Sequence, residues 1–450
     1  MTIKGTSGND SLSGTGGNDI FNMAQGGTDS VEGGAGNDSF HFGATFDMTD
    51  TISGGIGNDI LVLTGDYSGA HQLSFTSNSL TSVEAIQVSA GHSYNLTTTE
   101  LNVSAGVTMK VDASALGAAD VFTFNGEAET NGNFTITGGA GNDTIRDGGI
   151  SSNVHAGDGN DTIYGMASGH QTVFGEGGND FFSMQSASSA TFSGGDGNDT
   201  VGTGSFLVNT DNLDGGAGSD EIDMGAGYAG GFVFKAHTIS NVETLFLDLN
   251  QSFKLTMADG NVAAGQHMDI DGDLLQNGNT AYIDASRETD ATLFIGGGTG
   301  NDTLIGGQAG TTFSGGGGHD VMTAGAGADT FLYYGEPSDS SGPTYDTIKG
   351  FDGMHDNFNL IPTVTGFDAA ITAGTLNTSH FDDNLATAVD AAHLAAGHAT
   401  MFTATHGNLA GHTFLVVDAN GVAGYQSGGD FVMELTGGTN LASVGVGSFI

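Results

Sequence analysis

The sequence predicts an all-β fold, a parallel β-roll or β-solenoid with a small α/β cap at its C-terminal end. A nine-residue unit, G-G-x-G-N-D-x-U-x with U apolar, recurs along the chain, as in residues 33–40 and 54–61. Its glycines permit the positive φ of a sharp turn. Its apolar position makes the x-U-x triplet a short strand with one inward side chain. Two units then complete one coil, and neighbouring coils would stack about 4.8 Å apart.

Composition narrows the class of protein. Asp and Glu number 52 against seven Lys and Arg, a formal net charge of -45. Such a chain repels itself and lacks the clustered Lys and Arg that nucleic-acid binding requires. We therefore expect no nucleic acid and no anionic membrane as a partner. The 79 glycines come with three prolines and no Gly-X-Y period, which excludes collagen, and 28 phenylalanines oppose disorder.

Three absences add to this. Cysteine is missing, so no disulfide framework or thiolate metal site exists. Residues 1–14 show no charged head followed by an apolar run, and we expect no cleavable signal peptide. No stretch of about 18 apolar residues occurs, so we expect no membrane-spanning helix.

The repeat turns supply candidate calcium ligands, because glycine turns aim carbonyl oxygens and an Asp carboxylate at one point. Calcium takes six to eight oxygens at loose geometry, and two adjacent turns can provide them. We expect several Ca²⁺ ions and the following thirteen ligands: Asp10, Asp19, Asp29, Asp38, Asp59, Asp143, Asp161, Asp180, Asp199, Asp220, Asp302, Asp320 and Asp329. Asp50 lacks its glycines and Thr311 replaces an Asp, so at most weak binding is expected there.

The spacing of these aspartates predicts which edges bind. Steps near nine residues in the first block place calcium turns on both edges of the coil. Steps of 18 to 21 residues between Asp143 and Asp220 leave one edge as a plain turn, for example at 151–154 and 170–173. Apolar residues before and after each Asp predict two core columns. These are Ile136, Val154, Val173, Phe192 and Leu213 in one column, and Ile145, Ile163, Phe182, Val201 and Ile222 in the other.

The repeats divide the chain into six predicted regions. They are calcium block 1 (1–62), wider β-solenoid segment 1 (63–137), calcium block 2 (138–223), wider segment 2 (224–296), calcium block 3 (297–334), and a C-terminal cap and secretion-signal region (335–450). The two wider segments match at an offset of 159 residues, as Val83-Glu84 matches Val242-Glu243. We therefore infer a duplication.

The cap region carries its own signals. Ser379 and Asp382 fit a capping box before an Ala-rich run to about His398, which predicts the one real helix. Residues 414–417 and 431–435 are strand candidates on either side of Asn420-Gly421, a pair that suits a tight turn.

Three other patterns could carry function, and each has a simpler interpretation that we favour. Asp269, Asp271 and Asp273 alternate like a ligand cluster, but the outward face of a strand explains them at about three to one. The histidines between 380 and 412 could bind zinc or sense pH, but they match no zinc spacing, and surface histidines are favoured at about nine to one. A ladder of outward-facing threonines could contact ice or another subunit, but the strand propensity of threonine is the explanation favoured at about five to one. Its members are Thr135, Thr172, Thr191 and Thr312.

The phased nonapeptides resemble those of RTX proteins, which are exported by type I secretion systems. The family's closing pattern D-x-I-x-x-F is matched by Asp346, Ile348 and Phe351, with Asp356 and Leu360 following at a slightly different spacing. The resemblance implies secretion to the extracellular space or cell surface, an uncleaved C-terminal export signal, and partnership with type I machinery. It also implies that calcium binds only outside the cell, where binding free energy becomes folding free energy.

The prediction of function depends on which catalytic motifs and domains accompany the repeats. No G-x-S-x-G elbow, P-loop or zincin helix occurs, and the repeats start at residue 5 without a preceding non-repeat domain, so we expect no enzyme. The favoured hypothesis is a structural protein that self-assembles at the cell surface, as an S-layer or filament component. A monomeric adhesin or a glycan-, ice- or surface-binding module is the alternative, and a polysaccharide-active enzyme is the second alternative.

Overall fold

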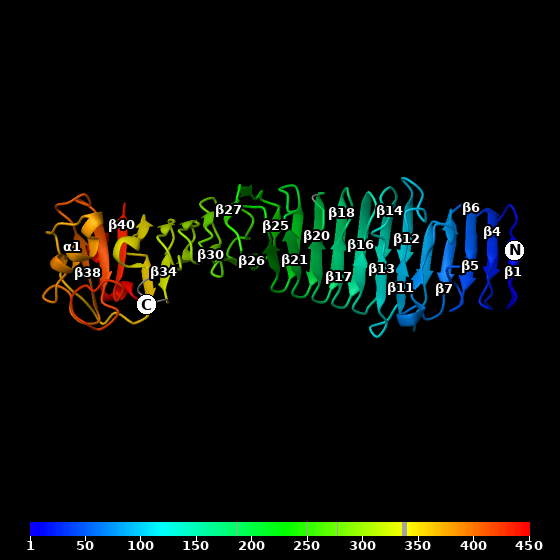
Figure 1. The fold of residues 1–450 in the computed structure, drawn as a ribbon, viewed down its shortest axis with the longest axis horizontal. Coiled ribbons are helices and arrows are strands. Elements are labelled where there is room, and N and C mark those ends of the chain that lie inside the picture. Colours follow the sequence, from blue (N-terminus) through cyan, green and yellow to red (C-terminus); the bar gives the residue numbers. More distant parts are fainter. Residues whose placement is uncertain (187, 249, 277, 335–339) are drawn as a thin grey trace. The chain divides into compact units, whose positions relative to one another are not determined.

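The computed structural model describes residues 1–186, 188–248, 250–276, 278–334 and 340–450. It confirms the predicted fold class: a mostly β parallel β-solenoid with one short helix near the C-terminus (Figure 1). The chain forms two compact units. The first comprises residues 1–223 and 238–242, and the second comprises 224–237 and 243–450.

The first unit contains three sheets whose paired strands are parallel. The longest runs in the order β1 (Thr2–Lys4), β3 (Ile20–Asn22), β5 (Ser39–Phe42), β7 (Ile60–Leu63), β10 (Ala85–Val88), β12 (Thr108–Asp112), β14 (Asn133–Thr137), β16 (Ser151–Asp158), β18 (Gln171–Gly177), β20 (Ala190–Asp196), β22 (Asn212–Ala217), β25 (Ile239–Ser240). The second runs β8 (Leu73–Ser74), β11 (Tyr94–Thr97), β13 (Phe122–Asn125), β15 (Thr144–Arg146), β17 (Thr162–Gly165), β19 (Phe181–Met184), β21 (Thr200–Gly204), β23 (Glu221–Met224). The short third sheet runs β2 (Ser11–Ser13), β4 (Ser30–Ala35), β6 (Thr51–Ile56), β9 (Leu80–Thr81).

Between β14 and β23, the core of this unit contains the two predicted columns of apolar side chains. The column partners align in register from β14 to β22, with Val154 opposite Val173 and Val173 opposite Phe192. All ten side chains are buried, with exposed fractions of 3% or less. The rings of Phe182 and Phe192 stack across the interior with centroids 5.3 Å apart. One or two large inward side chains per short strand therefore fill the narrow coil, as Phe122 and Phe124 do in β13.

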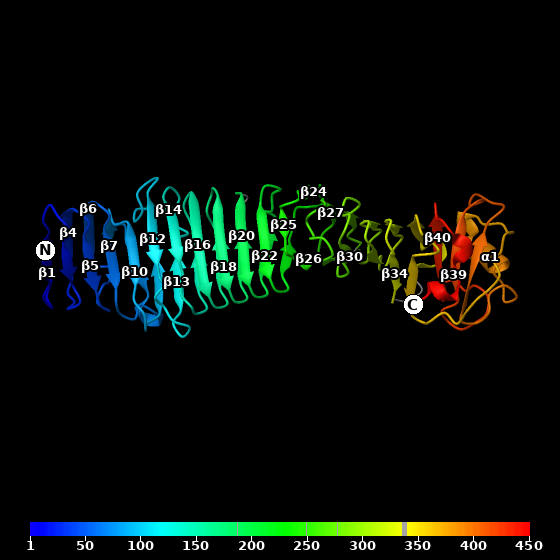
Figure 2. The same ribbon diagram turned by 180° about the vertical axis from the view of Figure 1, so that it is seen from behind.

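The second unit continues the same construction and adds the cap (Figure 2). One sheet runs β26 (Thr244–Leu247), β28 (His267–Asp271), β30 (Thr292–Gly296), β32 (Thr311–Ser314), β34 (Thr330–Tyr333), β36 (Asn357–Leu360). The other runs β24 (Phe232–Val233), β27 (Phe253–Thr256), β29 (Ala281–Asp284), β31 (Thr303–Ile305), β33 (Val321–Thr323), β35 (Asp346–Lys349), and continues into the cap with β40 (Phe431–Thr436), β39 (Thr413–Val417), β38 (His398–Thr403), β37 (Gly366–Phe367).

The wider segments contain strands that recur at an offset of 159 residues, as β11 (Tyr94–Thr97) and β27 (Phe253–Thr256) do. A turn that is closed by an asparagine side chain recurs with them. The Asn102 side-chain oxygen accepts from the backbone N–H of Thr99 at 2.7 Å, and the Asn261 oxygen accepts from Ala258 at 2.7 Å. The predicted six-region division itself stays a prediction.

The cap differs from its prediction in the length of the helix. Helix α1 spans Phe381–Ala388 and does not extend to His398. The N-cap residue is His380, and it makes no side-chain capping bond, so the predicted capping box from Ser379 is wrong. The helix ends because the carboxylate of Asp390 accepts from the backbone N–H of Ala392 at 2.9 Å, a local bond that competes with helical continuation.

The two predicted cap strands are present as β39 and β40, and they pair antiparallel. The link between them, 418–430, is longer than the tight turn that Asn420-Gly421 suggested. A third strand, β38, pairs antiparallel with β39 and begins at His398, where the Ala-rich run had predicted helix. Among the described residues, no helix has the length and apolarity needed to cross a membrane.

Candidate metal sites

Eleven of the thirteen predicted aspartates accept a hydrogen bond from the coil that precedes them. The Asp199 Oδ1 atom accepts from the backbone N–H of Asp180 at 2.7 Å, Asp180 accepts from Asp161 at 2.8 Å, and Asp161 accepts from Asp143 at 2.7 Å. The corresponding bond is made by Asp29, Asp38, Asp59, Asp143, Asp220, Asp302, Asp320 and Asp329. One oxygen of each carboxylate thus fixes the register between coils, and this bond orients the other oxygen.

The second carboxylate oxygen is buried without a hydrogen-bond partner in six of these turns. The six residues are Asp38, Asp59, Asp161, Asp180, Asp199 and Asp302. All six are at most 2% exposed. An unsatisfied charged oxygen away from water is strongly unfavourable, so six regularly placed ones call for a cation.

The first glycine of each turn leaves the space in which a cation fits. A Cβ on Gly194 would lie 2.0 Å from Asp199 Oδ2 and 2.2 Å from the carbonyl oxygen of Gly215 in the next coil. A Cβ on Gly175 would meet Asp180 Oδ2 and the Gly194 carbonyl in the same way. The space is therefore bordered by a carboxylate and a carbonyl from adjacent coils. An all-oxygen donor set of this kind fits Ca²⁺, which would neutralise the carboxylates and hold adjacent coils together.

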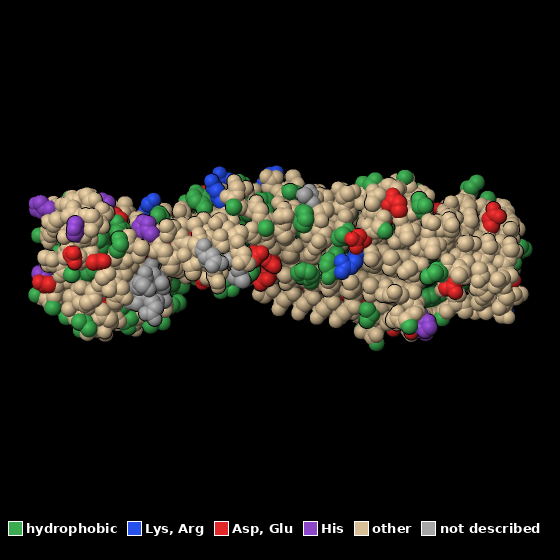
Figure 3. Space-filling model, viewed as in Figure 1, with side chains coloured by type: hydrophobic (Ala, Val, Ile, Leu, Met, Phe, Trp, Pro, Cys, Tyr) green, Lys and Arg blue, Asp and Glu red, His purple; other side chains and the backbone are tan. Residues whose placement is uncertain are grey.

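Burial sets the electrostatics of this column. Desolvation raises the pKa of Asp161 to about 8, of Asp180 to about 7 and of Asp199 to about 6, and neighbouring carboxylates add to the effect. In the second unit, burial raises the pKa of Asp302 to about 7. Figure 3 shows the consequence on one face, where acidic side chains are sparse although the chain contains 52 of them. A bound cation would offset this desolvation and favour the ionised form of these carboxylates.

Not every predicted ligand is placed alike. Both carboxylate oxygens of Asp143 accept backbone N–H bonds, from Phe122 and Gly139, and Asp329 does the same. Both carboxylate oxygens of Asp10 accept hydrogen bonds from Thr6, one from its backbone N–H and one from its hydroxyl. In Asp19, Oδ1 lies 2.6 Å from the N-terminal ammonium. These carboxylates are already engaged, so they are weaker candidates than the six with an unpartnered oxygen.

The weak turn at Asp50 has a specific geometry. Its Oδ1 accepts from the backbone N–H of Asp29 at 2.7 Å, and its Oδ2 accepts from Asp47 at 2.8 Å. No oxygen is left over for an ion, which fits the expectation of weak binding. Thr311, in place of an Asp, donates its backbone N–H to Asp329.

Sequence reasoning missed a second ladder, which is formed by the Asn that precedes most of the repeat aspartates. The Asn179 Oδ1 atom accepts from the backbone N–H of Asn198 at 2.8 Å, and Asn198 Oδ1 accepts from Ser219 at 2.9 Å. Asn therefore bonds the following coil, while Asp bonds the preceding one. The N-D pair found in most copies of the repeat was the available signal for this division of roles.

The plain edge of the second block also holds buried acids that sequence reasoning passed over. Asp147 accepts from the backbone N–H groups of Met166 and Ala167, and the Ser152 hydroxyl donates to its other oxygen. Asp211 accepts from the backbone N–H groups of Ala190 and Val208, one at each oxygen, both at 2.8 Å. All four oxygens have donors, so both residues brace turns and leave no oxygen for a metal ion.

The other sequence candidates do not assemble a site. Asp269 and Asp271 are half-buried on β28 with Asp269 bonded to His267, as on the outward face of a strand. The cap histidines pair separately, His393 with Asp390, His398 with Asp368 and His412 with Glu434. In the portion of the chain that the structure describes, no group of three metal-ligating side chains includes a histidine.

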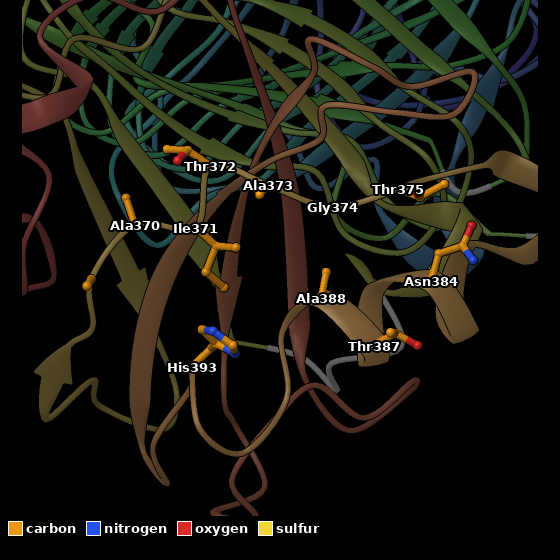
Figure 4. Close-up of a pocket in the computed structure, with 11 residues that line it drawn as sticks. Ala370, Ile371, Thr372, Ala373, Gly374, Thr375, Asn384, Thr387, Ala388 and His393 are labelled. Carbon is orange, nitrogen blue, oxygen red and sulfur yellow. The ribbon is translucent and has the colours of Figure 1, made fainter.

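A hollow of about 550 Å³ lies in the cap beside helix α1 (Figure 4). It is lined mainly by alanine, threonine and glycine, together with Ile371, Asn384 and His393. His393 is its one titratable lining residue, and its ring nitrogen bonds Asp390 at 2.7 Å. This lining offers no nucleophile with a base beside it.

Comparison with known proteins agrees with the geometry of the turns. A family model described as the RTX calcium-binding nonapeptide repeat matches residues 2–26, 23–49, 49–66, 130–149, 137–168, 147–182 and 296–331. The chain carries RTX calcium-binding repeats. The RTX matches cover the N-terminal turns, the turns around Asp143 to Asp180 and those around Asp302 to Asp329. No curated protein matches the chain.

Proposed function

We propose that this chain is an extracellular RTX scaffold that folds when it meets calcium and then self-associates at the cell surface, without catalytic activity. The observation that carries the proposal is the column of buried carboxylate oxygens without partners, as at Asp161, Asp180 and Asp199. Like-charged neighbours one coil apart oppose folding when no cation is present. Calcium binding then supplies the folding free energy.

The repeats also support an extracellular location. RTX proteins are typically secreted, and calcium sites in extracellular modules have dissociation constants of about 10⁻⁴ to 10⁻³ M. Such sites stay empty where calcium is scarce and fill outside the cell. A chain that remains expanded inside the cell suits export through type I machinery.

Strand edges support self-association. Among the described residues, β1 and β2 are edge strands, because each pairs with another strand on one side only. Edge strands expose backbone N–H and C=O groups that pair readily with another chain. A solenoid offers these groups in a direction along which copies can add repeatedly, which suits an array or filament.

A second candidate function is the binding of a surface by a monomeric protein, and one observation favours it. On strands β14 to β20, Thr135, Thr172 and Thr191 line one outward face, with Asn153 between the first two. A shallow hollow of about 460 Å³ lies beside Thr135 and Thr172. Regularly spaced hydroxyls could meet an ordered surface or a glycan.

Calcium titration of the purified chain separates these possibilities. We expect the circular dichroism of a β fold to develop as calcium reaches the millimolar range, followed by arrays or fibres in electron microscopy and rising light scattering. Equal β content in excess chelator would refute calcium-driven folding. A strictly monomeric protein at high concentration in calcium would refute self-association and leave surface binding as the better candidate.

A further inference from the structure

Three acidic side chains meet in the second unit at a turn that lacks the nonapeptide. Asp259 follows strand β27, while Glu288 and Asp290 follow strand β29, and the two strands are parallel neighbours in one sheet. One carboxylate oxygen from each of the three lies within 4.8 Å of the others. No other such group of His, Cys, Asp or Glu occurs in the residues that the structure describes.

Glu288 is the buried member of this cluster. It is 1% exposed, and its Oε1 accepts from the backbone N–H groups of Asp290 and Ala291, each at 3.2 Å. Its Oε2 is buried without a hydrogen-bond partner. The backbone bonds hold the carboxylate in place, as Oδ1 does in the repeat turns, and they leave one oxygen uncompensated.

The other two carboxylates are exposed, and the turn positions one of them. The backbone N–H and the hydroxyl of Thr289 donate to Asp259 Oδ1 at 3.1 and 2.8 Å. This contact ties the two coils together at the cluster. Within the described part of the chain, no Lys or Arg forms an ion pair with any of the three acids, although Arg287 is adjacent to Glu288 in sequence. Three carboxylates are thus gathered, and one of them is buried and has an oxygen without a partner.

We propose that Asp259, Glu288 and Asp290 form a calcium site distinct from the RTX turns. The donors are carboxylate oxygens only, which a hard divalent cation prefers. Two of the three ligands are exposed, so water can complete the six to eight oxygens that Ca²⁺ takes. The ion would clamp the coil of β27 to the coil of β29 without the nonapeptide. This inference does not depend on self-association or on ion binding at the nonapeptides.

The first unit contains the same turn with two differences, of which only one removes a carboxylate. At the offset of 159 residues stand Glu100, Glu129 and Asn131. Glu129 is 2% exposed, and its Oε1 accepts from the backbone N–H groups of Asn131 and Gly132 at 2.9 and 2.7 Å. The backbone N–H and the hydroxyl of Thr130 donate to Glu100, just as those of Thr289 donate to Asp259.

The presence of Asn131 in place of an aspartate removes one charge and adds a direct hydrogen bond. The Asn131 side-chain nitrogen donates to Glu100 Oε1, so the amide links the coils where the other cluster places a third carboxylate. Glu129 Oε2 remains without a partner, so one buried ligand is retained. We expect the Glu100 cluster to bind calcium more weakly than the Asp259 cluster, and the pair provides a matched comparison within one chain.

The test exchanges the Asp and Asn residues between the two clusters in the full-length protein. Asp290→Asn copies the residue that the first unit tolerates, so the fold should be kept, and Asn131→Asp makes the reverse change. Bound calcium is counted by equilibrium dialysis with atomic emission, and circular dichroism checks the fold. We expect Asp290→Asn to lose one ion per chain and Asn131→Asp to gain one. Anomalous scattering from calcium-grown crystals should place an ion at the Asp259 cluster in the unaltered protein, with the RTX turns as internal reference.

The possible contrary results are distinct. Unchanged stoichiometry in a folded Asp290→Asn variant would overturn the proposal. Occupied RTX turns with no calcium peak at the Asp259 cluster would do the same. If Asp290→Asn does not fold, Glu288→Gln replaces it, since the glutamine oxygen can accept both backbone bonds while the ligand charge is removed. Loss of the one ion in that variant supports the site, and retention overturns it.

Discussion

Replacing Asp180 with asparagine should stabilise the protein in chelator, and calcium should cancel most or all of that gain. The Asp180 Oδ1 bond to the backbone N–H of Asp161 can be kept by the asparagine oxygen. The buried, unpartnered Oδ2 atom is replaced by a neutral amide group. The substitution therefore removes a buried charge in the absence of calcium and removes a calcium ligand in its presence.

The magnitudes follow from the structure. Burial raises the pKa of Asp180 from 3.8 to about 7, and at about 1.4 kcal/mol per pKa unit this is an unfavourable contribution of up to about 4 kcal/mol. Solvent screening at the turn reduces the figure to about 2 kcal/mol. With a dissociation constant of about 10⁻⁴ to 10⁻³ M, losing one ion at about 10 mM calcium removes about 1.4 to 2.7 kcal/mol.

The assay is denaturant unfolding followed by circular dichroism at pH 8, in excess chelator and in about 10 mM calcium. We expect Asp180→Asn to stabilise whatever β structure the chelated protein retains by about 2 kcal/mol. Calcium should stabilise the unaltered chain by about 1.4 to 2.7 kcal/mol more than it stabilises the variant, so in calcium the two proteins should differ by less than about 1 kcal/mol.

Asp143→Asn is the matched control. Both Asp143 oxygens accept backbone N–H bonds, so an asparagine there turns an amide N–H₂ toward the Gly139 donor. This variant should be destabilised in both conditions. Destabilisation of Asp180→Asn by the same amount with and without calcium would refute the reasoning, because it would show that the unpartnered oxygen holds no ion.

Three further outcomes are expected. In chelator, stability should fall as the pH rises from about 4 to about 8. The folded chain keeps protons on groups such as Asp161, whose pKa is about 8, whereas the unfolded chain releases them at a pKa of about 3.9. A pH titration followed by circular dichroism tests this, and stability that rises over that range would contradict it. Gly194→Ala should lose one calcium by equilibrium dialysis, because its Cβ occupies the space between carboxylate and carbonyl, whereas Gly17→Ala, with nothing within 4 Å, should lose none. Asn198→Ala should lower the unfolding free energy by about 1 kcal/mol, because the Ser219 N–H loses its acceptor; an unchanged denaturation midpoint would argue against the Asn ladder.

The sequence predicted most of what is regular in this chain. The coil period, the inward columns such as Val154 and Val173, and the turn glycines all follow from spacing, because each coil meets mainly its neighbours and local pattern becomes tertiary structure directly. The cap was predicted less well. There, helix α1 stops at Ala388 because Asp390 forms a local turn and His398 begins a strand paired with β39, a contact between residues that no local pattern reveals.

By itself, the sequence determined that carboxylates would line the turns in excess of any available positive charge. Only the tertiary structure decided which oxygens are left for a cation. Asp180 and Asp143 occupy the same position in the repeat, yet one has an unpartnered oxygen and the other has two backbone donors. The Asp259 cluster was likewise invisible in the sequence, because its ligands come from two coils about 30 residues apart and only the pairing of β27 with β29 brings them together.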